Sequence, residues 1–363
     1  MQFLHVVGAR PNFMKAAPVL QALSKRPGVV QMLVHTGQHY DANMSGVFFE
    51  QLGMPQPDVN LDVGSGSHAR QTAEIMLRIE PVLEEQDPDW LVVYGDVNST
   101  VAASLVAAKL GIRIAHVEAG LRSFDLTMPE EINRMVTDRL ADLLLTPSAD
   151  GDENLLIEGV RPERIRRVGN VMIDTLVRLL PRAEAKWPEL HDKLELSDTP
   201  YALITLHRPS NVDDGATLLP LLEALTAIGE QVRCVFPVHP RTRRRMSDLG
   251  IRPGDGVVLT EPMGYLEFLA LQRHACMVIT DSGGIQEETT FLGVPCLTMR
   301  ENTERPITVE LGTNTLVGRD VDRLKREAAA MLDGGRKHGS LPPLWDGQAG
   351  ERIADALMEA PSV

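Results

Sequence analysis

Three acidic side chains in the first half of the sequence follow short apolar runs closely enough to share one chemical task. Asp96 follows "WLVVY", Glu118 follows "IRIAHV", and Glu130 lies shortly afterwards in "MPEEINR". Carboxylates that lie together can act as general acid and general base towards one substrate. The pattern therefore favours a cluster for acid–base chemistry.

Each of these acids also has an ordinary structural explanation. Asp96 precedes a predicted helix and could cap it, because aspartate is a preferred capping residue. Glu118 lies four residues before Arg122 and could form a local ion pair with it. Glu130 lies at a helix start that Pro129 opens, where acids are favoured by the helix dipole and can pair with Arg134. Both explanations stay open at this point.

The stretch "TDSGGIQEE" in the second half suits an anion. Ser282, Gly283 and Gly284 follow an apolar run and open a predicted helix, whose free N–H groups and dipole attract phosphate. Glu288 lies one helical turn beyond Gly284 on the same face. Its carboxylate can accept hydrogen bonds from ribose hydroxyls, so the stretch predicts a nucleotide site, with Glu287 as a solvated helix acid.

Cationic groups follow other apolar runs. Arg10 and Lys15 bracket a turn in "GARPNFMK", where a phosphate would relieve their unfavourable position at a helix start; the alternative is two solvated surface cations. His207 and Arg208 follow "YALITL", a position that favours a functional histidine, and Arg305 lies in "MRENTERP". We therefore expect several positive groups around an anionic substrate.

The elements that position these residues alternate regularly. Short apolar runs, each followed by a helical pattern, occupy residues 3–7, 29–34, 90–94, 112–117, 140–146 and 165–168, and then 201–206, 232–238, 256–260, 275–280, 294–299 and 315–317. Such alternation predicts parallel sheets with helices on both faces. In these sheets ligands bind beyond the carboxyl ends of the strands, where the residues named above lie.

The two sets of runs are separated by a polar stretch at 182–200. We predict an α/β protein with two Rossmann-like domains, residues 1–172 and 173–350, and a closing helix at about 351–363. The formal net charge of −14 argues against nucleic acid or an anionic membrane as partner.

Features of the whole chain indicate a reducing compartment. The cysteines Cys234, Cys276 and Cys296 lie in or beside apolar runs with no paired spacing, which predicts buried free thiols. The sequence contains neither a metal-type CxxC pattern nor a signal peptide, and no apolar run approaches the ~18 residues of a membrane span. We expect a soluble cytoplasmic protein.

Taken together and in order, "GARPNFMKAAPV", "YGDVNST", "HVEAGLRS", "MPEEINR", "TLHRPSN", "TDSGGIQEE" and "MRENTERP" resemble the non-hydrolysing UDP-N-acetylglucosamine 2-epimerases. The resemblance implies the glycosyltransferase-B architecture, a UDP-sugar in the interdomain cleft, a C-terminal helix that returns to the first domain, and a homodimer. It implies interconversion of UDP-GlcNAc and UDP-ManNAc through elimination of UDP, a 2-acetamidoglucal and re-addition of UDP. Neither a cofactor nor a metal is implied.

The resemblance also assigns roles residue by residue. It implies that Asp96, Glu118 and Glu130 are the acid–base carboxylates and that His207 is catalytic near the leaving diphosphate. The implied substrate-binding residues are Arg10, Lys15, Arg134, Phe268 against uracil, Ser282, Gly283, Gly284, Glu288 at the ribose, and Arg305.

Several positions depart from the better-known bacterial members. A Gly-His-Arg-Arg-Glu pattern is replaced by "LHRPSN", and Met263 stands where a glutamine contacts uracil. The segment 36–45 keeps Gln38 and His39 of an activator site but not its other residues, so we expect no allosteric activation. A related deoxy or diacetamido UDP-sugar, a glycosyltransferase of the same architecture, a hydrolysing 2-epimerase and a non-catalytic UDP-sugar-binding protein stay open as alternatives.

Overall fold

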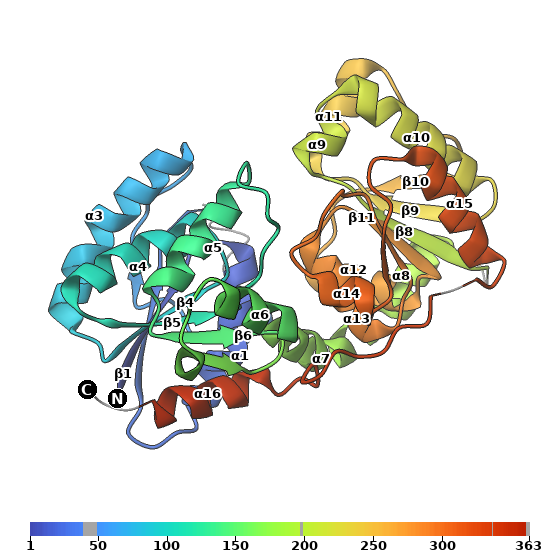
Figure 1. Ribbon diagram of the computed structural model, residues 1–363. Coiled ribbons are helices and arrows are strands. Elements are labelled where there is room, and N and C mark those ends of the chain that lie inside the picture. Colours follow the sequence, from blue (N-terminus) through green and yellow to red (C-terminus); the bar gives the residue numbers. More distant parts are fainter. Residues whose placement is uncertain (39–48, 197–198, 336, 361–363) are drawn as a thin grey trace. The chain divides into compact units, whose positions relative to one another are not determined.

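The computed structural model describes residues 1–38, 49–196, 199–335 and 337–360. The chain divides into two compact units, unit 1 (Met1–Leu176 and Pro343–Val363) and unit 2 (Val177–Pro342). Each unit contains one sheet in which every pair of neighbouring strands is parallel. The predicted α/β class with two parallel sheets is therefore confirmed (Figure 1).

The sheet of unit 1 has seven strands in the order β3-β2-β1-β4-β5-β6-β7. Its strands are β1 (Gln2–Val7), β2 (Val30–His35), β3 (Val59–Asn60), β4 (Trp90–Tyr94), β5 (Arg113–Val117), β6 (Leu143–Thr146) and β7 (Ile165–Arg167). The helices are α1 (Arg10–Leu23), α3 (His68–Gln86), α4 (Asn98–Leu110), α5 (Pro129–Leu140), α6 (Ala149–Ile157), a short 3₁₀ turn (Pro162–Arg164) and α16 (Ala349–Glu359), with α7 (Val171–Glu184) crossing into unit 2.

The sheet of unit 2 has six strands in the order β10-β9-β8-β11-β12-β13. They are β8 (Tyr201–Thr205), β9 (Arg233–Pro237), β10 (Val257–Thr260), β11 (Met277–Thr280), β12 (Cys296–Thr298) and β13 (Asn314–Leu316). The helices are α8 (Trp187–Lys193), α9 (Pro209–Val212), α10 (Gly215–Gly229), α11 (Pro240–Leu249), α12 (Tyr265–His274), α13 (Gly283–Leu292), α14 (Pro306–Glu310) and α15 (Val321–Leu332).

The central strands are largely apolar because helices cover both faces of each sheet. All five residues of β4 are buried, as expected for a parallel strand covered on both sides. On one face of unit 1, Ile75, Ile79 and Leu83 of α3 pack with Ala103 and Ala107 of α4 in a single apolar core. Burial of this kind, worth about 25 cal/mol per Å² of apolar surface, stabilises the scaffold that carries the polar strand ends.

The register of the central strands brings the predicted functional residues to common edges. Tyr94 of β4 lies opposite Val117 of β5, so Asp96 and Glu118 leave the sheet of unit 1 from neighbouring strands at the same edge. In unit 2, Thr205 of β8 lies opposite Thr280 of β11. His207 and the stretch that begins at Asp281 therefore emerge side by side.

The C-terminal helix α16 is part of unit 1. It lies against α1, and Gly350 lets the two helices approach closely, because a Cβ there would be 2.9 Å from the carbonyl oxygen of Pro18. Asp174 accepts hydrogen bonds from the backbone N–H groups of Ala349 and Gly350, which satisfies the start of α16. Figure 1 shows this red helix beside the strands and helices of the N-terminal unit.

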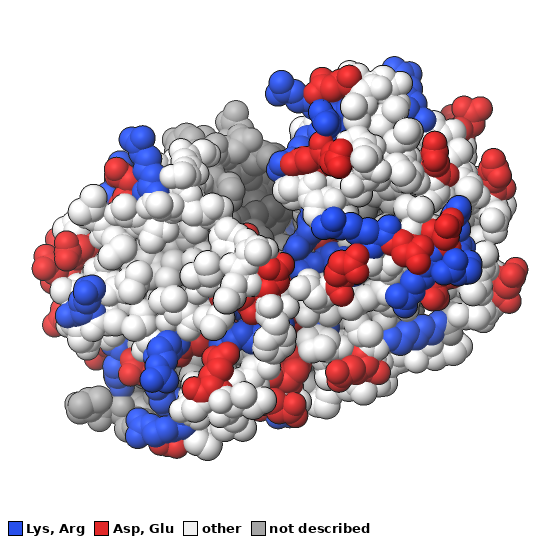
Figure 2. All heavy atoms as spheres, turned by 45° about the horizontal axis from the view of Figure 1, so that its top comes forward, with Lys and Arg blue, Asp and Glu red and all other residues white. Residues whose placement is uncertain are grey.

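Charges of both signs are distributed over the surface. On the face shown in Figure 2, acidic and basic side chains are interspersed on both units. None of the helices in the described ranges is long and apolar enough to cross a lipid bilayer.

Candidate active site

Two buried charges of unit 1 meet at the edge where β4 and β5 end. Lys15 of α1 forms an ion pair with Glu118, and both side chains are almost fully buried. Gly95 makes room for them: it has φ +61°, and a Cβ there would lie 2.5 Å from Lys15 Nζ and 3.0 Å from Glu118 Oε2. The interpretation of Lys15 as a solvated surface cation is wrong, because Lys15 is a partner of the predicted acid–base carboxylate.

Glu118 also has an unusual backbone. Its φ of +72° lies in the left-handed region, which costs a non-glycine residue of order 1–3 kcal/mol. The local alternative, an ion pair with Arg122, is not the arrangement found. Arg122 instead pairs with Asp138 and donates two hydrogen bonds to Glu158.

Asp96 is joined to α5. Arg134 forms ion pairs with Asp96 and with Glu131, the latter at 2.7 Å, and Asn133 donates to the Asp96 carbonyl oxygen. Helix α4 begins at Asn98 with Val97 as the capping residue, so the interpretation of Asp96 as the N-cap is wrong. Asp96 and Arg134 are thus brought together, as a shared site requires.

Glu130 and Glu131 differ sharply although they are neighbours. Glu131 is buried and accepts hydrogen bonds from the N–H groups of Ser123 and Phe124 as well as pairing with Arg134. Glu130 at the start of α5 is half-buried, and its carboxylate forms no ion pair or hydrogen bond with the residues that the structure describes. Of the two, Glu130 has the carboxylate suited to proton transfer, and Glu131 fixes the loop before α5.

In unit 2 a buried aspartate orients the predicted catalytic histidine. Asp281 is fully buried and accepts hydrogen bonds from the N–H groups of His207 and Arg208 and from the Asn211 amide. His207 Nδ1 lies 3.2 Å from Asp281 Oδ1, while the imidazole is 42% exposed. A histidine held at Nδ1 by a carboxylate can exchange a proton through Nε2. Sequence reasoning missed Asp281, although it directly precedes Ser282.

A second histidine lies near this pair. The rings of His207 and His239 are 5.9 Å apart, and His239 accepts a hydrogen bond from Arg241 N at the start of α11. Burial, together with the positive charges of His207 and Arg241, lowers the pKa of His239 from its ordinary value. His239 therefore caps the start of α11.

The predicted phosphate cradle is the start of α13, where Ser282 is the residue before the first turn. A Cβ on Gly284 would meet no atom within 4 Å, so the helix start is open at that point. A Cβ on Gly283 would lie 2.8 Å from Arg305 Nη1, which places the Arg305 guanidinium directly against the glycine. Free N–H groups and a guanidinium together suit a diphosphate.

Arg305 is held by two carboxylates. Its Nε lies 2.8 Å from Glu287 Oε1, and its Nη1 lies 3.3 Å from Glu304 Oε2. Glu304 also accepts two hydrogen bonds from Arg300. The prediction of Glu287 as a solvated helix acid is wrong, because its side chain is 1% exposed and pairs with Arg305.

Two further predicted contacts lie on neighbouring helices of unit 2. Glu288 is buried and accepts a hydrogen bond of 2.9 Å from the Tyr265 hydroxyl. Phe268, on the same helix α12 as Tyr265, is half-buried. Because a carboxylate has about four acceptor positions, the Tyr265 bond leaves capacity on Glu288 for ribose hydroxyls.

Some predicted residues lie outside the described part of the chain. They are the Arg10 side chain, and His39, Tyr40 and Asp41 of the segment compared with an activator site. Gln38 of that segment is buried, and its Oε1 accepts a hydrogen bond of 2.7 Å from Ser99 Oγ.

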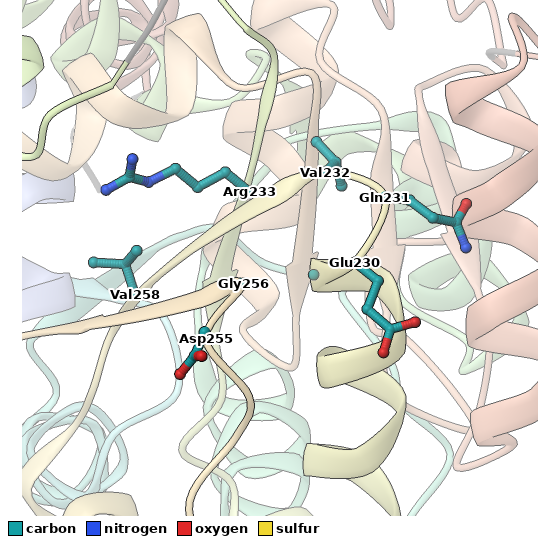
Figure 3. A pocket seen from close by; sticks show the side chains of 8 residues that line it. Glu230, Gln231, Val232, Arg233, Asp255, Gly256 and Val258 are labelled. Carbon is teal, nitrogen blue, oxygen red and sulfur yellow. The ribbon is translucent and has the colours of Figure 1, made fainter.

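An open cavity of about 410 Å³ lies elsewhere in unit 2 (Figure 3). Its charged lining residues are Glu230, Arg233 and Asp255, at the amino ends of β9 and β10. The predicted site residues lie at the carboxyl ends of strands, so this cavity is not part of the candidate site. The described residues include no cluster of three or more His, Cys, Asp or Glu arranged for a metal ion.

The two parallel α/β units, one with carboxylates at its strand ends and the other with a helix start suited to diphosphate, are an arrangement that suits an enzyme acting on nucleotide-linked sugars. The chain belongs to the UDP-N-acetylglucosamine 2-epimerase family, whose model matches residues 21–358. It is therefore a UDP-sugar 2-epimerase, and the glycosyltransferase and non-catalytic alternatives are set aside.

Named relatives extend over nearly the whole chain. The UDP-N-acetylglucosamine 2-epimerase of Methanocaldococcus jannaschii is 42% identical, covering 98% of this chain and 99% of the relative. The UDP-2,3-diacetamido-2,3-dideoxy-D-glucuronate 2-epimerase of Pseudomonas aeruginosa is also 42% identical, over 98% and 99%. The crystal structure of the Methanocaldococcus jannaschii enzyme in complex with UDP-GlcNAc and UDP matches with a TM-score of 0.89 over 99% of both chains at 41% identity.

Proposed function

We propose that the protein interconverts UDP-GlcNAc and UDP-ManNAc without releasing free sugar. The observation that carries the proposal is the pairing of Lys15 with Glu118 and of Arg134 with Asp96 at adjacent strand ends of unit 1. Two carboxylates with separate cationic partners can serve as distinct base and acid. Inversion at a carbon needs two such groups, one for each face of the sugar.

The proposed chemistry begins with elimination. A carboxylate of the Asp96, Glu118 and Glu130 set takes the C2 proton, the C2–H electron pair forms a C1=C2 double bond, and the C1–O bond breaks with its electrons going to UDP. The product is a 2-acetamidoglucal. Re-addition of UDP at C1 and protonation of C2 from the opposite face then give the epimer, with no net change in atoms or electrons.

The leaving group is assigned to unit 2. We assign the diphosphate to the helix start at Ser282, Gly283 and Gly284, with His207 and Arg305 stabilising its developing charge. Arg10 is proposed to bind the same group. Glu288 is assigned to the ribose and Phe268 to the uracil. These assignments need no metal, because guanidinium groups and helix N-termini can stabilise pyrophosphate.

A diacetamido UDP-sugar is the second candidate substrate. A relative named for UDP-2,3-diacetamido-2,3-dideoxy-D-glucuronate is as similar to this chain as the relative named for UDP-GlcNAc. The altered "LHRPSN" motif around His207 also leaves room for a different sugar.

Product analysis separates these possibilities. The protein is incubated with each UDP-sugar in turn, without added metal or NAD, and the products are separated and examined by NMR. We expect UDP-ManNAc from UDP-GlcNAc. Turnover of the diacetamido sugar alone would transfer the assignment to that substrate, and free ManNAc with UDP would identify a hydrolysing enzyme.

We propose that the protein forms a homodimer and that it works in the cytoplasm. The side chains of Phe124, Leu126, Ile132 and Met135, around the start of α5, are exposed and apolar, as subunit contacts often are. The free thiols of the three cysteines fit a reducing compartment. The molar mass measured by light scattering at micromolar protein concentration tests the dimer. The mass of a single chain would exclude it.

A further inference from the structure

A buried histidine lies beneath the carboxylates of unit 1, and the chemistry proposed above does not use it. His116 is in β5, directly below Glu118, and its side chain has no exposed surface. Its Nδ1 lies 2.6 Å from Asp138 Oδ1 and its Nε2 lies 2.8 Å from the Gly95 carbonyl oxygen. Both ring nitrogens therefore face acceptors.

Asp138 of α5 is bonded at both oxygens. Besides His116, it accepts a hydrogen bond of 3.1 Å from Gly120 N and pairs with Arg122 Nη1 at 2.7 Å. Burial alone would raise the pKa of Asp138, but the charges and hydrogen bonds of His116 and Arg122 lower it below its ordinary value. The Arg122 guanidinium favours the ionised form of Asp138 whatever the state of His116. An ionised Asp138 can only accept, so the proton between it and Nδ1 belongs to the imidazole.

The Gly95 carbonyl oxygen also can only accept. The hydrogen bond at Nε2 therefore requires a second proton on the ring. We propose that His116 is a buried imidazolium and that, with Asp138, it is a positioning residue for the epimerisation. The charge state of His116 follows from the hydrogen bonds alone. Only the positioning role rests on the proposed function.

The pair connects every element of unit 1 that carries a predicted acid–base carboxylate. His116 holds the carbonyl of Gly95, the residue before Asp96, and Asp138 holds the N–H of Gly120, two residues after Glu118. Asp138 itself lies on α5, which carries Glu130 in its first turn and also carries Arg134. One charged pair thus fixes the two strand-end turns to this helix.

The charges around the pair balance. Asp138 and the partly exposed Glu158 carry the negative charges, and Arg122 and the His116 imidazolium carry the positive charges. Arg122 donates to Glu158 at 2.7 and 2.8 Å. Buried charges are tolerated when they are paired and hydrogen-bonded in this way. A neutral His116 would leave either Asp138 or the Gly95 carbonyl without a donor.

The charge state is tested without turnover, on wild-type protein labelled with ¹⁵N at its histidine rings. The spectrum at pH 8 contains ten histidines, and His116→Gln or Asp138→Asn identifies the resonances of His116. Both ring nitrogens of His116 should carry a proton, because each of them faces an acceptor. A bare nitrogen on this ring would overturn the proposal.

The positioning role is tested with Asp138→Asn. An amide at this position cannot form an ion pair with the imidazolium or with Arg122, so the turns at Gly95 and Gly120 are held less firmly to α5. A displacement of about 1 Å at a reacting group can cost 10²-fold in rate. We expect kcat to fall about 10²-fold while KM and the affinity for UDP stay near wild type, because the assigned UDP residues other than Arg10 lie in unit 2. Rates are corrected for the folded fraction by urea unfolding.

Asp142→Asn is the matched control. Asp142 also bonds strand β5, accepting from Ile114 N at 2.9 Å, but near the end of the strand opposite the carboxylates. It should keep near wild-type kcat. Equal kcat in the two variants would refute the positioning role. If wild type epimerises neither sugar, the proposed function fails, whereas the ring spectrum still decides the state of His116.

Discussion

Replacement of Gly95 by alanine tests the arrangement of Lys15 and Glu118 most sharply. Gly95 has φ +61°, where an L-residue costs roughly 1–2 kcal/mol, so some loss of stability is expected from the backbone alone. The new methyl group would also lie 2.5 Å from Lys15 Nζ and 3.0 Å from Glu118 Oε2. The perturbation thus acts directly on the buried ion pair.

The size of the effect follows from these distances. Ordinary contacts between heavy atoms lie at roughly 3.5–4.0 Å, so Lys15 Nζ must move by about 1 Å. A displacement of that size near reacting groups can reduce the rate about 10²-fold. We expect Gly95→Ala to lower kcat by that factor, with unchanged affinity for UDP.

The assay compares Gly95→Ala with Gly111→Ala. Gly111 ends α4 with φ +76°, and a Cβ there would meet no atom within 4 Å. Urea unfolding should show a backbone loss of about 1–2 kcal/mol in both variants, with a further loss in Gly95→Ala from the crowded ion pair. Only Gly95→Ala should lose activity. If both variants keep similar kcat values, the Lys15–Glu118 pair is not part of the catalytic geometry.

Three further predictions concern unit 2. Gly284→Ala should raise the stability of the free protein by up to about 1 kcal/mol, because alanine has a higher helix propensity than glycine. The same substitution should weaken UDP binding. An unchanged UDP affinity in calorimetry would contradict the phosphate assignment. Glu288→Ala should remove most of the preference for binding UDP over 2′-deoxy-UDP. The expected loss of binding free energy is about 1.5–3 kcal/mol, the value of a hydrogen bond to a charged group. If the variant keeps the full preference, Glu288 does not bind the ribose. Burial raises the pKa of Cys234 to about 12 and that of Cys296 to about 11, so few thiolates form at pH 8. Neither thiol should react with a disulfide reagent before the protein unfolds. Reaction of Cys234 or Cys296 in the native protein would contradict this prediction.

Much of the fold could be predicted from the sequence because parallel strands leave a strong signal. Buried strands such as β4 and β8 are continuous apolar runs, and the predicted runs 90–94 and 201–206 match their bounds closely. The run 140–146 was assigned too early, since the strand begins at Leu143 and Leu140 ends α5. Strand β3 was missed because its two residues, Val59–Asn60, are too short to form a pattern.

The site could be predicted only in part. Strand-end positions place Asp96 and Glu118 at one edge of the sheet of unit 1, and His207 at an edge of the sheet of unit 2, because register alone brings them there. The partners were not predictable: Lys15 lies 103 residues from Glu118, and only the folded chain brings them together. Glu287 was misjudged for the same reason, since its partner Arg305 comes from the loop before α14.

Exchange at C2 of the sugar in D₂O is the most direct test of the central claim. Elimination and re-addition require that the C2 proton is exchanged with the solvent through a carboxylate. We predict that UDP-GlcNAc incubated with the protein gives UDP-ManNAc, with deuterium at C2 of both sugars by NMR. Epimer formed without deuterium, or complete absence of exchange with every UDP-sugar tested, would contradict the account.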